Sequence, residues 1–252
     1  MNGKQAERKL AIFYLSSLIL SSISTIFFTI IWKYWSETLN DCIEIDCGCI
    51  LYSVNSYKNF RGRDVSFCKY PIYSLIPSMT VGLILGVYHA YRSFIHRNLD
   101  DPQISQVVGE IDGDNCGNVF IVGPKKRSPC RVWWIPGFLA AIICLISLAH
   151  AYFILDGYYQ TCDEYRKYII QTLGSTGREV QAIHNRLSCN AIFDYMDYLH
   201  PDNYYWRRGV EIYTGYFFQI TIVTSWLNFL SWIIIFVINI HMARQKKNKF
   251  RT

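Results

Sequence analysis

The stretch IYTGYFFQITIVTSWLNFLSWIIIFVINIHM, Ile212–Met242, contains no Lys, Arg, Asp or Glu. A helix that crosses a bilayer needs about 20 mainly apolar residues, so this segment predicts a transmembrane helix with length to spare. A helix on the surface of a soluble protein would carry a charged stripe, and this segment has none. The segment therefore places the chain among membrane proteins.

Three further apolar stretches have the same character. Their cores lack charged side chains and contain Ser, Thr and Gly, which allow close helix contacts in lipid. We assign the four spans to residues 10–33, 71–92, 132–156 and 212–242. The expected fold is an all-α membrane protein, a four-transmembrane-helix bundle. The first span is too long for the apolar region of a cleaved signal peptide, so we expect it to be retained.

Charge patterning predicts how the spans are oriented. Charged residues make up only 17% of the chain, against about 25% in soluble domains. Short flanks rich in Lys and Arg face the cytoplasm. We therefore expect residues 1–9, 93–131 and 243–252 in the cytoplasm, and residues 34–70 and 157–211 as two extracellular loops at the plasma membrane. The net charge of +6 belongs to these flanks, so no nucleic-acid partner is expected.

Six of the nine cysteines fall in the two expected extracellular loops. An even set of cysteines in an oxidising compartment predicts disulfides that staple both loops. The CGC spacing and the oxidising side both argue against a zinc site. Cys162 with Cys189 is the favoured pair, although six cysteines allow 15 pairings. The predicted disulfide cysteines are Cys42, Cys47, Cys49, Cys68, Cys162 and Cys189.

The segment CILYSV, Cys49–Val54, has the composition of a β-strand, so some β structure is expected in the first loop. Cys47 and Cys49 are separated by a single residue and cannot easily bond to each other. They are expected to reach apart and tie this strand to Cys42, to Cys68 or to the second loop.

Two histidines lie within the expected spans, where an ionisable residue suggests a functional site. His89 falls near the cytosolic end of its span and His150 near the extracellular end of another. They are too far apart in depth to share a metal ion, so each is expected to form a hydrogen bond with a neighbouring helix. No metal and no cofactor are expected.

Two further features concern lipid. Cys130 lies next to the expected third span, and cysteines in that position are candidates for palmitoylation. The basic tail, residues 243–252, is able to attract anionic lipids of the inner leaflet. The alternative is that the tail only fixes the topology.

Several motifs resemble those of the transmembrane protein 179 family. They are FRGR at Phe60–Arg63 with Cys68 before the second span, HAYR at His89–Arg92, TCDEY around Cys162, SCNAIFD around Cys189, and FFQITIVTSWLNFLSWIII in the fourth span. This resemblance covers both loops and all four spans in order. It implies a four-span protein with both termini in the cytoplasm, and it implies no catalytic residue.

The sequence contains no nucleophile elbow, P-loop, HExxH or dinucleotide-binding motif, so we do not expect an enzyme. The expected function is that of an accessory subunit of a larger membrane channel or receptor, with self-association in adhesion or membrane organisation as the alternative. Aromatic and Arg residues are enriched at interface hot spots. The residues predicted to bind the partner are Arg61, Arg63, Tyr204, Tyr205 and Trp206, and their other role is to cover the loops' own small core.

Overall fold

The structure is a computed structural model of the 252-residue chain. It describes residues 3–40, 42, 46–56, 59–94, 103–104, 121–122, 131–173, 177, 180–181, 183, 187–199 and 212–249.

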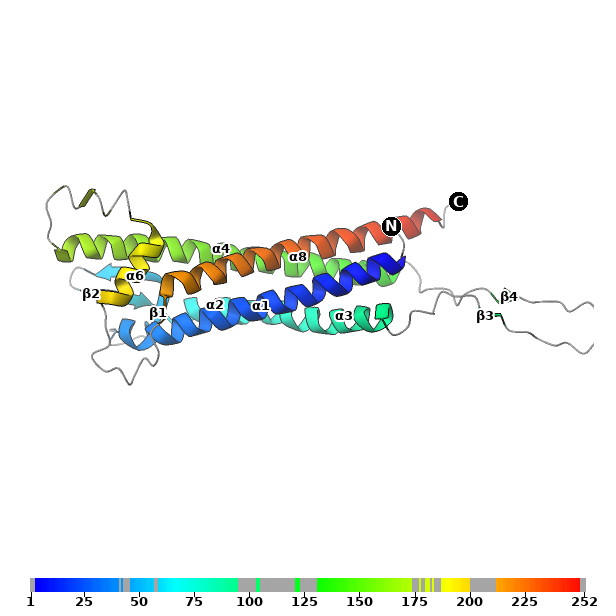
Figure 1. Cartoon of the computed structure of the whole chain (residues 1–252), viewed down its shortest axis with the longest axis horizontal. Coiled ribbons are helices and arrows are strands. Elements are labelled where there is room, and N and C mark those ends of the chain that lie inside the picture. Colours follow the sequence, from blue (N-terminus) through cyan, green and yellow to red (C-terminus); the bar gives the residue numbers. More distant parts are fainter. Residues whose placement is uncertain are drawn as a thin grey trace, which may run out of the picture.

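Long helices dominate the described residues and lie side by side along one axis (Figure 1). The three longest are α1 (Gly3–Leu39), α4 (Arg131–Leu173) and α8 (Thr214–Lys249). The remaining rod, the second along the chain, consists of α2 (Ser66–Ser74) followed by α3 (Ile76–Phe94). All four rods are long and apolar enough to cross a membrane, which confirms the four predicted apolar segments.

The second rod is interrupted at Leu75, between α2 and α3. Pro71 lies inside α2, and Pro77 follows the break at the start of α3. A proline has no N–H to donate, and its ring collides with the carbonyl group four residues earlier, so it interrupts a helix. The helix resumes at once, because the Met79 N–H donates to the Leu75 carbonyl oxygen at 3.0 Å.

The central pair of helices is α1 and α8, which pack against each other. Helix α3 packs mainly against α1, and α4 mainly against α8. Small residues allow α3 to approach closely, since a Cβ atom at Gly82 would lie 3.1 Å from the Tyr14 carbonyl oxygen. Close packing through small residues is the usual way in which helices associate in lipid.

One end of the bundle carries extra structure and is here called the disulfide end (Figure 1). A hairpin of β1 (Cys49–Ser56) and β2 (Asn59–Arg63) packs there, with β1 against α4. Helix α6 (Cys189–Leu199) packs against α4 and α8 at the same end. The start of α1 and the end of α8 lie at the other end, here called the tail end. The remaining described strands are a separate antiparallel pair, β3 (Gln103–Ile104) and β4 (Ile121–Val122).

The helices extend beyond the expected spans. The third span was assigned to residues 132–156, but α4 continues to Leu173 and occupies the start of the predicted second loop. The extension is held by tertiary contacts, because Tyr158, Cys162, Tyr165 and Ile169 form one buried face of it. The all-α expectation therefore describes the bundle but not the disulfide end, where the β-strand predicted around Cys49–Val54 is present.

Candidate functional site

The disulfide end is the most constrained part of the described structure. All six predicted cysteines form disulfides, and the pairs are Cys42–Cys47, Cys49–Cys68 and Cys162–Cys189. The first two fasten the chain before the hairpin and join β1 to α2. The third joins α4 to α6 and is the pair favoured from the sequence.

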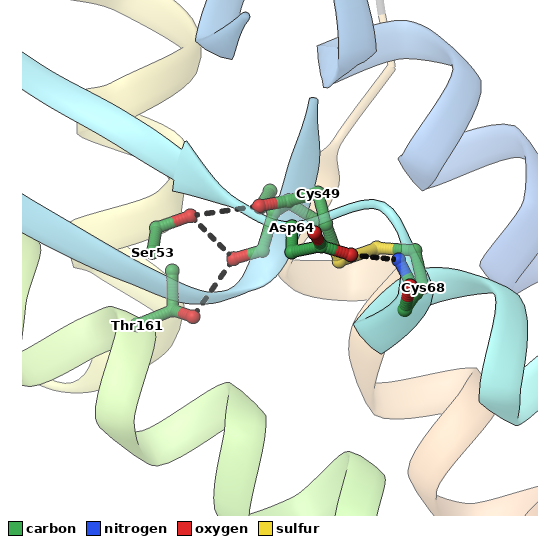
Figure 2. Close-up of a disulfide and its surroundings, with 7 residues drawn as sticks. Cys49, Ser53, Asp64, Cys68 and Thr161 are labelled. Carbon is green, nitrogen blue, oxygen red and sulfur yellow. Dashed lines mark hydrogen bonds between the residues drawn. A yellow bond between two sulfur atoms is a disulfide. The ribbon is translucent and has the colours of Figure 1, made fainter. Parts of the chain in front are cut away.

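Strand β1 bulges where it meets α4. The β1–β2 register shifts between Cys49 and Val54, and Tyr52 adopts the left-handed backbone conformation with φ of 59°. Side chains satisfy the carbonyl groups that the bulge frees (Figure 2). The Ser53 hydroxyl donates to the Ile50 carbonyl oxygen at 2.7 Å, and the Thr161 hydroxyl of α4 donates to the same oxygen at 2.9 Å. The bulge is therefore fixed to α4 rather than free.

The tip of the bulge fits into α4 at Gly157. A Cβ atom there would lie 2.9 Å from Leu51 Cδ2, so a larger residue would push the bulge away. The Tyr52 hydroxyl lies 3.0 Å from Asp156 Oδ2 and 3.2 Å from the Phe153 carbonyl oxygen. Burial, followed by the hydrogen bond to Asp156, raises the pKa of Tyr52 above its usual value. Tyr52 thus remains a neutral donor at physiological pH.

Strand β2 presents two arginines on its outer side. Its burial alternates, with Phe60 and Gly62 buried and Arg61 and Arg63 exposed. Gly62 is required because a Cβ atom would collide with the Cys47 carbonyl oxygen and lie 2.8 Å from that of Cys49. We call Arg61 and Arg63 the arginine face. Among the described residues, the Arg63 guanidinium covers the Phe67 ring at 5.5 Å and contributes to lowering the pKa of Asp64.

Two other basic side chains at this end have acidic partners. Arg166 Nη1 lies 2.9 Å from Asp163 Oδ1, and Lys167 Nζ lies 2.6 Å from Glu164 Oε1. Asp64, next to the arginine face, accepts the Ser66 N–H at 2.7 Å (Figure 2). The Ser66 side chain and then its backbone N–H hold the pKa of Asp64 below its usual value. The Asp64 carboxylate thereby binds the N–H of Ser66, the first residue of α2.

A buried hydrogen-bond relay connects α6 to two membrane-length helices. The Trp35 indole N–H of α1 donates to the Thr214 hydroxyl oxygen at 2.8 Å. Thr214, the first residue of α8, donates its own hydroxyl proton to Asp197 Oδ1 at 2.6 Å and its N–H to Asp197 Oδ2 at 2.9 Å. The Asp197 carboxylate of α6 therefore binds the first N–H of α8 from outside that helix, where a negative charge also favours the helix dipole.

A second polar network, here called the polar seam, lies inside the bundle. Ser17 donates to Asn228 Oδ1 at 2.7 Å, and the Trp232 indole N–H donates to the Ser78 hydroxyl oxygen at 2.9 Å. The seam draws on all four rods, and nearly all of its side chains are buried. Its members are Ser17, Ser24, Ser74, Ser78, Ser147, His150, Ser225, Asn228 and Trp232.

His150 is the link between α4 and the seam. Its Nδ1 lies 2.9 Å from the Ser74 hydroxyl oxygen and its Nε2 lies 3.2 Å from that of Ser225. Ser225 donates to the Thr221 carbonyl oxygen at 2.7 Å and Ser74 to the Pro71 carbonyl oxygen at 3.1 Å, so His150 lies between two hydroxyl groups that are each also bonded within their own helix. His150 therefore forms hydrogen bonds with two neighbouring helices, α2 and α8, which confirms the expectation for this residue.

His89 behaves differently from this expectation. Its Nδ1 has no hydrogen-bond partner among the described residues, and its ring lies parallel to that of Tyr14 with centroids 5.7 Å apart. Nearby, Arg92 Nη2 lies 3.2 Å from the buried carboxylate of Glu7. The tail end is thus joined by ring packing and one ion pair that connects α1 with α3.

The sequence identified only part of this arrangement. Arg61 and Arg63 lie together on the arginine face, whereas Tyr204, Tyr205, Trp206 and Cys130 lie outside the described residues. The relay of Trp35, Thr214 and Asp197 was missed. Its available signal was Thr214 immediately before the apolar run, in a typical N-cap position. The partner Asp197 has no local signal.

Comparison with protein-family models, curated protein sequences and solved structures gives no match. The resemblance to the transmembrane protein 179 family therefore stays a prediction.

Proposed function

We propose that this protein is a non-enzymatic accessory subunit of a larger channel or receptor in the plasma membrane. The disulfide end faces outward, both termini face the cytoplasm, and the partner binds through the helices and the disulfide end. The observation that carries the proposal is the arginine face, two exposed cations on a platform fastened by disulfides, neither of which forms an ion pair among the described residues.

Exposed aromatic residues support this placement in a bilayer. On α4, Trp134 and Tyr152 are exposed, and on the second rod Tyr73 and Tyr91 are exposed. Each pair is separated by roughly 18 positions, which is about 27 Å of helix. A hydrocarbon core is about 30 Å thick, and Trp and Tyr favour its two boundaries. The exposed aromatic residues of two antiparallel rods thus indicate the same two boundaries of a hydrocarbon core.

The bundle interior favours a role performed at the surface. Tyr14, Phe28 and Trp232 fill it as fully buried side chains, and the polar seam satisfies its own donors and acceptors. The outward faces of the helices are apolar, with Leu83, Ile84, Phe138 and Leu145 at least half exposed. Such faces suit lipid or another membrane helix.

Cross-linking in intact cells, followed by purification in mild detergent, tests the proposal. The expected result is a complex in which one larger membrane protein is present in fixed proportion to the tagged chain, counted by mass spectrometry. A chain that is recovered only as monomers would contradict the accessory role. An impermeant maleimide tests orientation separately, since cysteines placed at the termini are expected to react only after the cells are opened.

Self-association is the second candidate, and one feature of α1 favours it. Ile12, Ile19 and Ile26 are between 53% and 58% exposed and recur every seven residues along one stripe. A repeat of seven is the spacing at which two helices interlock, and Lys33 and Glu37 continue this stripe with opposite charges. Homo-oligomers without a second protein, lost in an Ile19→Ala variant, would support this candidate over the first.

A further inference from the structure

We infer that the arginine face binds a short acidic segment in the outer part of the partner protein, one that offers two carboxylates to Arg61 and Arg63. This inference rests on the proposed function and specifies the chemistry of the partner. It begins with geometry. Alternate residues of a strand point to the same side, and positions two apart are separated by about 7 Å. Arg61 and Arg63 therefore present two guanidinium groups side by side.

The lack of an ion pair distinguishes these two arginines from Arg166 and Lys167. Arg166 and Lys167 each have an acidic partner within 2.9 Å. The Arg61 side chain is exposed and makes no ion pair or hydrogen bond within the described part of the chain. The Arg63 side chain covers the Phe67 ring and contributes to lowering the pKa of Asp64, without forming an ion pair with it. Arg166 and Lys167 are thus occupied by ion pairs within the fold, whereas Arg61 and Arg63 are available to a partner.

The platform holds the two guanidinium groups in place before any partner arrives. Phe60 anchors β2 from below, with its ring 4.9 Å from that of Tyr165. Gly62 lets the strand press against the Cys47–Cys49 backbone, which two disulfides fasten on either side. A surface that is already ordered loses less entropy on binding, so even a small contact gains affinity.

Height above the membrane argues against a lipid phosphate as the ligand. Phe60, beside Arg61, packs on Tyr165 and Tyr168. These two tyrosines follow the exposed Tyr159 of α4 by roughly six to nine residues, which is about 9–14 Å of helix. Taking Tyr159 as the highest membrane-facing ring, Arg61 lies beyond a headgroup layer about 6 Å thick. Arg63 lies closer to that boundary, because it covers the Phe67 ring, which packs on Phe153 with centroids 6.1 Å apart. A single lipid headgroup would have to span this difference in height to reach both arginines.

Charge in the surroundings argues against an extended polyanion such as a sulfated glycan. Patches that bind such chains contain a run of five or more basic residues. Here Asp64 directly follows Arg63, and Glu164 accepts the Asn55 N–H of the strand that pairs with β2, so a long anionic chain would meet repulsion. A guanidinium matches a carboxylate with two parallel hydrogen bonds, so a short segment with two carboxylates fits the available cations.

The test uses the full chain in nanodiscs of neutral phosphatidylcholine. The probe is a biotinylated peptide of four Glu-Gly repeats, made tetravalent on streptavidin so that weak contacts are measurable by biolayer interferometry. Wild type is expected to bind this probe, with affinity falling as salt rises. The double variant R61Q/R63Q is expected to lose at least tenfold in affinity. The matched control K33Q/K167Q removes the same charge at the disulfide end and is expected to bind as wild type does.

Two further measurements separate folding from recognition. Mass mapping of the three disulfides in R61Q/R63Q is expected to give the wild-type pairs. The variant R61K/R63K keeps both charges but loses the forked geometry, and it is expected to bind with intermediate affinity. Equal binding of the probe by R61Q/R63Q, no binding by wild type, or stronger binding of heparin or of phosphatidylserine vesicles would each overturn the inference.

Failure of this inference is distinguishable from failure of the proposed function. If R61Q/R63Q still co-purifies the larger membrane protein in full proportion, the accessory role stands and the arginine face is not its contact. If wild type binds the acidic probe but co-purifies no second protein, the arginine face recognises acid and the accessory role fails.

Discussion

The indole N–H of Trp35 donates to the hydroxyl oxygen of Thr214 at 2.8 Å, and both residues are fully buried. Trp35 lies near the end of α1, and Thr214 begins α8 at the opposite end of the sequence. Because Thr214 also holds Asp197 of α6, the short helix at the disulfide end is bonded directly to the two central helices of the bundle. A force applied to α6 by a partner would therefore act on α1 and α8 together.

Replacing Thr214 with Val removes the hydroxyl group at nearly constant volume. Trp35 and Asp197 each lose a partner, and an unsatisfied buried group costs about 1–3 kcal/mol. We expect the free energy of unfolding, measured by denaturant titration in detergent, to fall by about 2 kcal/mol or more. Thr221→Val is the matched control, since the buried Thr221 hydroxyl donates only to the Phe217 carbonyl oxygen of its own helix. An equal loss in both variants would remove the special role of the relay.

Gly62→Ala is expected to distort the platform under the arginine face. The added methyl group would collide with the Cys47 carbonyl oxygen, and overpacking of this kind costs about 1–3 kcal/mol. We expect a lower yield of the Cys42–Cys47 and Cys49–Cys68 pairs, measured by mass mapping without reduction. Gly177→Ala is the control, because a Cβ atom there meets nothing within 4 Å. Wild-type disulfide yield in Gly62→Ala would show that β2 tolerates the displacement.

His150 and Ser74 should be energetically coupled through their hydrogen bond. In a double-mutant cycle with His150→Leu and Ser74→Ala, the coupling energy is expected to be about 0.6–1.7 kcal/mol, the range for such bonds between membrane helices. Ser21→Ala provides the control cycle, since Ser21 donates within α1 to the Ser17 carbonyl oxygen. Coupling of the same size in both cycles would mean that the effect is not carried by the His150–Ser74 bond.

Asp64 should make the start of α2 sensitive to acid. Its pKa is lower in the folded chain than the usual value of 3.8, so its carboxylate stabilises the fold above that pH. This stabilisation is lost as the pH falls below the usual pKa of 3.8, which applies to the unfolded chain, and through the lower pKa of the folded chain. Hydrogen exchange at the start of α2, expressed relative to the intrinsic rate of unprotected amides at each pH, should therefore rise between about pH 4 and pH 2 in wild type. In Asp64→Asn it should be faster at neutral pH and change less on acidification, and an identical acid response in the two proteins would exclude Asp64 as the cause.

The sequence by itself determined the four apolar rods and the even set of six loop cysteines. Both are properties of composition along short segments, because crossing a bilayer requires only a long run without charge. The strand at Cys49–Val54 was visible for the same reason, since β-branched and aromatic residues favour extended backbone.

The tertiary structure alone decided which distant groups meet. Fifteen cysteine pairings were open, and the pairs follow from where β1 and α2 place Cys49 and Cys68. The end of α4 at Leu173 was also hidden, because Asp156, Asp163 and Glu164 mark the membrane boundary in the sequence while the buried face of Tyr158 and Tyr165 continues the helix. Hydropathy and periodicity describe a residue's neighbours along the chain. Hydrogen bonds such as Trp35–Thr214 depend on contacts across the bundle, which form only when the helices pack.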